Sequence, residues 1–161
     1  MTDTPSGAGP SDAAPSGRLK LIARDLEDLS VVSSMVQDAI APPVDMVYLA
    51  EEGVFALALN RFKWESAGDA PPYERTHAGL RIDHVQAVRR KNLDPVADKE
   101  RLLDLLAVAY ADGEAGGPGA VHLQFADDRA VRLEVGALSV ALADLGEPWP
   151  TQWKPGHDLD R

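Results

Sequence analysis

The chain contains no cysteine, and this absence removes several kinds of chemistry at once. A disulfide, a thiolate nucleophile and a cysteine-ligated metal site are all excluded. No apolar run approaches the roughly 20 residues that a membrane-spanning helix needs. Basic residues are in deficit as well, because 16 Lys and Arg stand against 26 Asp and Glu, a formal net charge of −10. A net negative charge does not attract a protein to nucleic acid or to anionic lipid, although a local basic patch remains possible.

The first 17 residues lack large apolar side chains apart from Met1. They cannot bury enough apolar surface to offset the conformational entropy lost on ordering, so we expect residues 1–17 to be a disordered tail. The same stretch has neither the basic start nor the apolar core of a secretory signal. The sequence therefore predicts a cytoplasmic protein.

Composition predicts one domain. Apolar residues make up 45% of the chain, enough for a single packed core. We expect this domain to cover residues 18–145 and to be followed by an irregular tail over residues 146–161. Within that tail, Trp149 and Trp153 are the only residues able to pin the chain to the domain.

Two alternating segments between residues 120 and 135 predict an antiparallel hairpin. One face is apolar, and the other carries polar side chains, namely His122, Gln124, Arg132 and Glu134. Asp127 and Asp128 supply the turn. Because an isolated hairpin is marginal in water, its apolar face needs further strands and a covering element.

One helix is predicted over residues 26–40. Asp25 stands at the N-cap position, and apolar residues follow at three- and four-residue spacing as far as Ile40. Pro42 and Pro43 end the pattern. Its single apolar stripe indicates that the helix lies across a sheet.

The remaining pattern predicts strands at residues 19–23, 44–50, 54–64, 77–89, 103–110 and 138–142. The apolar face changes phase near Asn60 and again near Asp83 and His84, which predicts a bulge at each place. Residues 100–111 also fit a helix by propensity, but their alternation favours a strand.

Together these elements predict an α+β fold. About seven or eight mostly antiparallel strands would form a strongly bent sheet, either a sandwich or a half-barrel, covered by the N-terminal helix. A pleckstrin-homology-like split barrel agrees in strand count, but only by analogy, and its usual C-terminal helix is absent from the pattern.

Three stretches carry a resemblance to a known family: residues 19–40, residues 54–65 with the sequence VFALALNRFKWE, and residues 131–149. On these the chain resembles domain-of-unknown-function family 2948, which is widespread in alphaproteobacteria. The resemblance covers nearly everything from Leu19 to Trp153 and implies one intact domain. Because the family has no assigned activity, the resemblance implies no catalytic residues.

No motif fixes a reaction. The chain has no G-x-S-x-G, no P-loop and no dinucleotide fingerprint, and its four histidines lack metal-ligand spacing, so neither a cofactor nor a metal is expected. The sequence favours a non-enzymatic binding or scaffold module. The alternative is a small enzyme whose site lies at the bulged strand near His77 and His84.

Basic side chains on the middle strands suggest a site for an anionic ligand or an acidic protein partner. The candidate residues are Arg61, Lys63, Trp64, Arg81 and Arg89. If the two long strands pair, several of these would converge on one exposed face, with Arg61 and Lys63 as a cationic pair. The simpler interpretation is that they protect a sheet edge from aggregation. Neither nucleic acid nor a membrane is an expected partner, and the pattern leaves the oligomeric state open.

Overall fold

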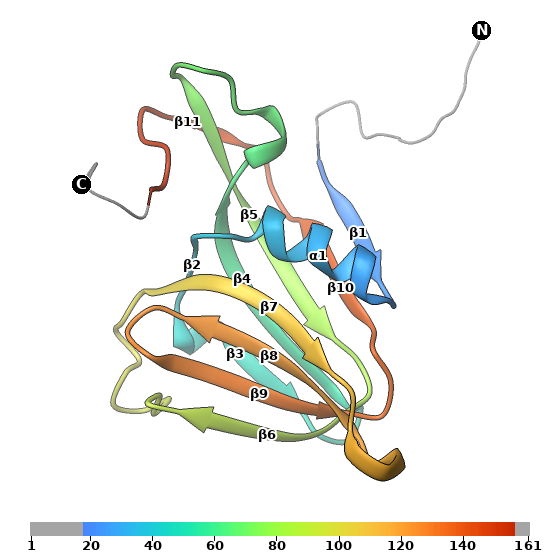
Figure 1. Cartoon of the computed structure of the whole chain (residues 1–161). Coiled ribbons are helices and arrows are strands. Elements are labelled where there is room, and N and C mark those ends of the chain that lie inside the picture. Colours follow the sequence, from blue (N-terminus) through green and yellow to red (C-terminus); the bar gives the residue numbers. More distant parts are fainter. Residues whose placement is uncertain (1–17, 157–161) are drawn as a thin grey trace, which may run out of the picture.

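The computed structural model describes residues 18–156, so the tail expected over residues 1–17 and the last five residues lie outside the described part. Within it, one α-helix accompanies an antiparallel, unclosed sheet of eleven strands, which confirms the α+β fold (Figure 1). None of the helices in this range is long and apolar enough to cross a membrane.

The sheet contains three more strands than the sequence predicts, because two strands are only three residues long and the strand predicted over residues 77–89 is two strands. The strands are β1 (Lys20–Ala23), β2 (Ala39–Ala41), β3 (Met46–Leu49), β4 (Val54–Phe62), β5 (Tyr73–Ile82), β6 (Val85–Lys91), β7 (Leu103–Ala111), β8 (Gly119–Phe125), β9 (Arg129–Val135), β10 (Val140–Asp144) and β11 (Trp149–Thr151). Their order is β1-β10-β5-β4-β2-β7-β8-β9-β6, with β3 paired to β4 and β11 to β5. Short 3₁₀ turns lie at Pro43–Asp45 (η1), Trp64–Ser66 (η2) and Glu114–Gly116 (η3).

The helix α1 (Leu26–Met35) begins as predicted but ends earlier. The Asp25 side chain accepts the Asp28 backbone N–H, so Asp25 is the N-cap. The expected extension to Ile40 is wrong. Asp38 adopts a left-handed φ of 63° and its N–H donates to the carbonyl of Leu105, so the chain leaves the helix and joins the sheet as β2.

The sheet folds over on itself around one core. In Figure 1 the strands β7, β8, β9 and β6 form one side, β4, β5, β10 and β1 the other, and α1 lies against β7, β1 and β10. The inward faces of both sides are fully buried, as at Phe55, Leu80, Leu123 and Leu133. The predicted role of the helix as a cover for the sheet is confirmed.

The two predicted bulges are resolved differently. The β4–β5 register runs without a break from Phe55 to Phe62, so no bulge lies at Asn60. Both faces of β4 are instead buried near its end, where Phe62 packs against Tyr73. The predicted strand over residues 77–89 is two strands, because the chain turns at His84, where φ is 60°, and the register shift lies between Val85 and Ala87.

The remaining expectations concern three segments. Residues 103–111 form the strand β7, as the alternation favoured. The turn of the β8–β9 hairpin is confirmed, with φ of 65° at Asp127 and 59° at Asp128. The tail over residues 146–161 is not irregular throughout, because β11 pairs with β5.

Candidate functional site

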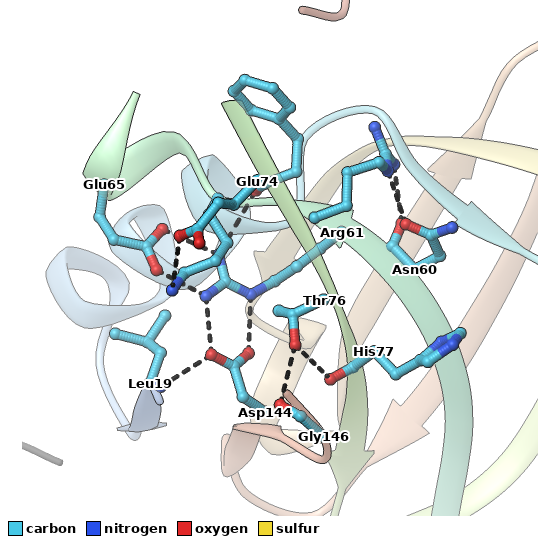
Figure 2. Close-up of polar contacts among 12 residues, drawn as sticks. Leu19, Asn60, Arg61, Glu65, Glu74, Thr76, His77, Asp144 and Gly146 are labelled. Atoms are coloured by element: carbon cyan, nitrogen blue, oxygen red, sulfur yellow. Dashed lines mark hydrogen bonds and ion pairs between the residues drawn. The ribbon is translucent and has the colours of Figure 1, made fainter. Parts of the chain in front are cut away.

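Arg61, the first residue of the predicted patch, is completely buried. Its Nε and Nη2 atoms donate to the two carboxylate oxygens of Asp144 at 2.8 and 2.9 Å, and its terminal nitrogens donate to Glu65 at 2.9 and 2.6 Å (Figure 2). The Leu19 N–H also donates to Asp144, at 2.8 Å. Burial opposes the charged guanidinium, but the bonds to Glu65 and Asp144 outweigh it and raise the pKa of Arg61. This cation holds β4, β10 and η2 together.

Lys63 and Trp64 also serve the fold. Lys63 is 5% exposed, and its Nζ lies 3.5 Å from a carboxylate oxygen of Glu74. The Trp64 indole N–H donates to the carbonyl of Gln37 at 3.0 Å, and its ring meets that of Phe62 edge-on. Neither side chain contributes to an exposed cationic pair with Arg61.

Arg81 and Arg89 are exposed, but they lie on different strands of the folded sheet. Arg81 on β5 pairs with Asp83 at 2.9 Å, and Arg89 on β6 pairs with Glu134 at 3.1 Å. The patch expected from the sequence therefore does not form. The prediction assumed that Arg61 lies on an exposed face. Arg61 instead continues the series of buried, inward-facing side chains of β4, and its ion pair with Asp144 takes the place of an apolar contact.

A different group of basic side chains does come together, on the outer face of β8, β9 and β6. Arg89 and Arg132 are direct cross-strand partners, and Arg132 is also the partner of His122. We call His122, Arg132 and Arg89 the basic row. The residues beside Arg132 on β9, Val131 and Leu133, are fully buried, so the alternation turns the row to solvent.

The charges in this row are only partly balanced. Glu134 pairs with Arg89, whereas Arg132 has no ion pair within residues 18–156. Like charges directly opposite each other on neighbouring strands destabilise a sheet. His122 contacts Gln124 Oε1 through Nε2 at 3.1 Å, and because an amide oxygen only accepts, Nε2 donates in this contact.

A shallow hollow of about 280 Å³ borders the row. Its walls are Ala109, Tyr110, Ala111, Ala120, His122 and Arg132. Three of these walls are small alanine side chains. The arrangement presents cationic donors on a broad surface, which suits carboxylates better than a buried small molecule.

A larger groove lies elsewhere, beside Arg75, and has a volume of about 650 Å³. Arg75 donates from Nε to Asn60 Oδ1 at 2.6 Å and from Nη2 to the Asn60 carbonyl at 3.0 Å. Burial lowers the pKa of Arg75, partly offset by the charges of Asp104 and Asp38. Two carboxylates and two cations, Arg75 and Lys154, line this groove, so its charge does not select an anion.

The predicted histidine site is divided between two places. His77 on β5 stacks against Trp149, with ring centroids 4.8 Å apart, and lines a hollow of about 240 Å³ with Asn60 and Asp45. His84 lies at the corner after β5, seven positions and roughly 20 Å along the chain from His77. The described residues include no group of three His, Asp or Glu side chains that could hold a metal.

Sequence reasoning found Arg89 but not its neighbours Arg132 and His122. A signal was present, because the hairpin turn at Asp127 and Asp128 fixes the register of the two strands. The turn consists of the three residues 126–128, and counting outward from them sets His122 opposite Arg132. The third strand of the row, β6, could not be placed in this way, because 37 residues separate Lys91 from its hydrogen-bonded partner Asp128.

Comparison with known proteins identifies the family alone. The model of a family described as a protein of unknown function, DUF2948, matches residues 19–157. No curated protein and no solved structure gives a match. Because the matched range covers most of the chain, the protein belongs to the DUF2948 family.

Proposed function

We propose that this protein is a non-enzymatic binding module of the cytoplasm, and that the basic row receives an acidic segment of a protein partner. The observation that carries the proposal is the direct pairing of Arg89 with Arg132 across β6 and β9. Folding alone gains nothing from this juxtaposition, because it brings two like charges together. A carboxylate bound between them would remove the repulsion.

Edge protection is the competing explanation for these charges. It accounts for Arg89, Arg90 and Lys91, because β6 is the last strand of the sheet order. It does not account for Arg132 or His122, because β9 and β8 each have a strand on both sides. The basic row therefore extends from the edge strand β6 onto β9 and β8, which need no edge protection.

The spacing of the row suits an extended acidic peptide. Neighbouring strands lie about 4.8 Å apart, so the row spans roughly 10 Å from β8 to β6. Alternate side chains on one side of an extended peptide are roughly 7 Å apart, which lets two carboxylates reach the row together. Nucleic acid is disfavoured as a partner by the net charge of −10.

A titration with labelled hexaglutamate peptide tests the proposal. Arg89→Gln with Arg132→Gln should weaken binding of the full chain at least about tenfold, the effect of losing roughly one charge-assisted hydrogen bond. The matched control is Arg81→Gln with Arg90→Gln, which removes the same charge from β5, in the other half of the sheet, and from the opposite side of β6. Equal weakening by both variants would show that only net charge matters and would contradict the proposal.

A second candidate function, a small enzyme, is supported by one observation. His77, Asp45 and Asn60 line the same hollow, so an imidazole, a carboxylate and an amide border one space. Hydrolysis of simple ester and phosphate substrates tests this candidate. An activity that His77→Gln removes and His84→Gln preserves would support it, and the absence of any such difference would count against it.

A further inference from the structure

The outer face of the other half of the sheet is unusually apolar. One cross-strand row on β3, β4, β5, β10 and β1 consists of Val47, Ala56, Arg81, Ala141 and Ile22. In the next row, Ala58, Gly79, Ala143 and Lys20 are partners, and Asp45 lies beside Ala58 at the far end. Antiparallel sheets normally present polar side chains to water on such a face.

The helix α1 does not cover this face, because it lies on the opposite side of the sheet. Ile22 is 49% exposed and Val47 is 45% exposed, and they flank the smaller residues from opposite edges. Leu145, 60% exposed, lies over Gly79, where its methyl carbon is 3.6 Å from the position of a Cβ. Aliphatic side chains thus flank a centre of small residues from which Leu145 and Arg81 project, and a second sheet can approach between them.

The two ends of the second row carry opposite charges. Lys20 lies on β1 at one edge of this half of the sheet, and Asp45 precedes β3 at the other edge. Both side chains are exposed, and neither has an ion pair within residues 18–156. A two-fold axis parallel to the strands and passing over β5 would reverse this row onto itself. It would bring Lys20 opposite Asp45 of a second copy, and Ile22 opposite Val47.

We propose that a second copy of this chain covers the face, in an isologous dimer with sheet packed on sheet. Self-complementarity is what this symmetry requires, and the positions of Lys20 and Asp45 supply it. Arg81 lies near the axis, where its pairing with Asp83 at 2.9 Å limits repulsion between copies. The dimer leaves the basic row free, because the row lies on β8, β9 and β6, and it is independent of the proposed function.

The size of the face indicates a weak dimer. Five strands at about 4.8 Å spacing and four or five residues of length give a face roughly 20 Å by 15 Å. That is about 300 Å² on each copy and roughly 600 Å² in total, below the roughly 1,200 Å² of a standard specific interface and in the range of weak, transient contacts. We therefore expect association at micromolar to submillimolar concentration.

Analytical ultracentrifugation of charge-reversed variants tests the dimer. Wild type should associate as its concentration rises. Lys20→Asp or Asp45→Lys alone should weaken association at least tenfold, because a dimer of either variant brings like charges together at both contacts between residues 20 and 45. A one-to-one mixture of the two variants should associate again, since the mixed dimer has opposite charges at both contacts. Lys99→Asp, an exposed reversal in the loop before β7, should leave association unchanged.

Two results would overturn the inference. One is a wild-type protein that stays monomeric throughout the micromolar to submillimolar range. The other is a mixture of Lys20→Asp and Asp45→Lys that associates no better than either variant alone. Ala141→Glu adds a check at the centre of the face, where a dimer that persists unchanged would also contradict it.

Discussion

Arg61 and Asp144 are 83 residues apart in sequence and form a two-bond ion pair in the interior, with Asp144 Oδ1 2.8 Å from Arg61 Nε. The Asp144 side chain is 1% exposed. Arg61→Met would leave this carboxylate buried without its cation, so we expect a loss of roughly 3–5 kcal/mol in the free energy of unfolding. Urea denaturation measures the change.

The matched control for Arg61 is Arg81→Met, which removes an exposed, ion-paired arginine from the adjacent strand. This variant should change stability by no more than about 0.5 kcal/mol. Arg61→Met with Asp144→Leu should recover part of the loss, because no unpaired charge is then buried. Equal effects of Arg61→Met and Arg81→Met would contradict the structural role of Arg61.

Arg132 should oppose folding slightly. Because it faces Arg89 directly, we expect Arg132→Thr to raise the free energy of unfolding by about 0.2–1 kcal/mol, the size of a cross-strand pair effect. A double-mutant cycle with Arg89→Thr isolates the pair from the change in strand propensity. A favourable coupling between the two arginines would refute the repulsion on which the proposed function rests.

Asp98 should make stability dependent on pH below about 4, near its usual pKa of 3.8. The Asp94 N–H donates to its carboxylate and Arg101 Nε bonds it at 2.6 Å, and these contacts lower the pKa of Asp98 in the folded chain. Because the pKa of Asp98 is lower in the folded chain, its ionised carboxylate stabilises the fold above pH 3.8. This stabilisation disappears as the pH falls through the pKa of Asp98 in the folded chain. The Tm difference between wild type and Asp98→Asn should therefore be present at pH 7 and narrow below pH 4. A difference that stays constant with pH would exclude this ionic contribution.

Trp149 should hold β11 against β5 through its contact with His77. Trp149→Ala removes the ring, so amide hydrogen exchange should accelerate at Tyr73 and Arg75, where β11 pairs with β5. Trp153 provides the control because it is 81% exposed, and Trp153→Ala should leave exchange in β5 unchanged. Unchanged exchange in both variants would mean that backbone pairing alone secures β11.

Local patterns predicted most of the fold correctly. Alternation located the β3–β4 and β8–β9 hairpins, and the cap at Asp25 located the start of α1. The end of α1 was missed because Ile40 continues the helical spacing, although Asp38 is bonded to β7. That bond joins segments far apart in the chain, and local periodicity carries no information about it.

The candidate site was predicted less well because burial is not a local property. Arg61 follows Leu59 in the inward alternation of β4, and an arginine at such a position suggests an exposed strand end. Its partner Asp144 lies on β10, which is separated from β4 by β5, and local patterns do not predict this strand order. Arg89 was found as a basic strand residue, but its relation to Arg132 depends on the β6–β9 register.

The most direct test of the central claim is to map by ¹H–¹⁵N NMR where hexaglutamate peptide binds the full chain. The account predicts that the amide chemical shifts of His122, Arg132 and Arg89 change with peptide concentration and return to their free values as salt is added. The amide chemical shifts around Arg81 and Lys20 should not change. Shift changes confined to the Arg75 groove, or absent from β8, β9 and β6, would contradict it.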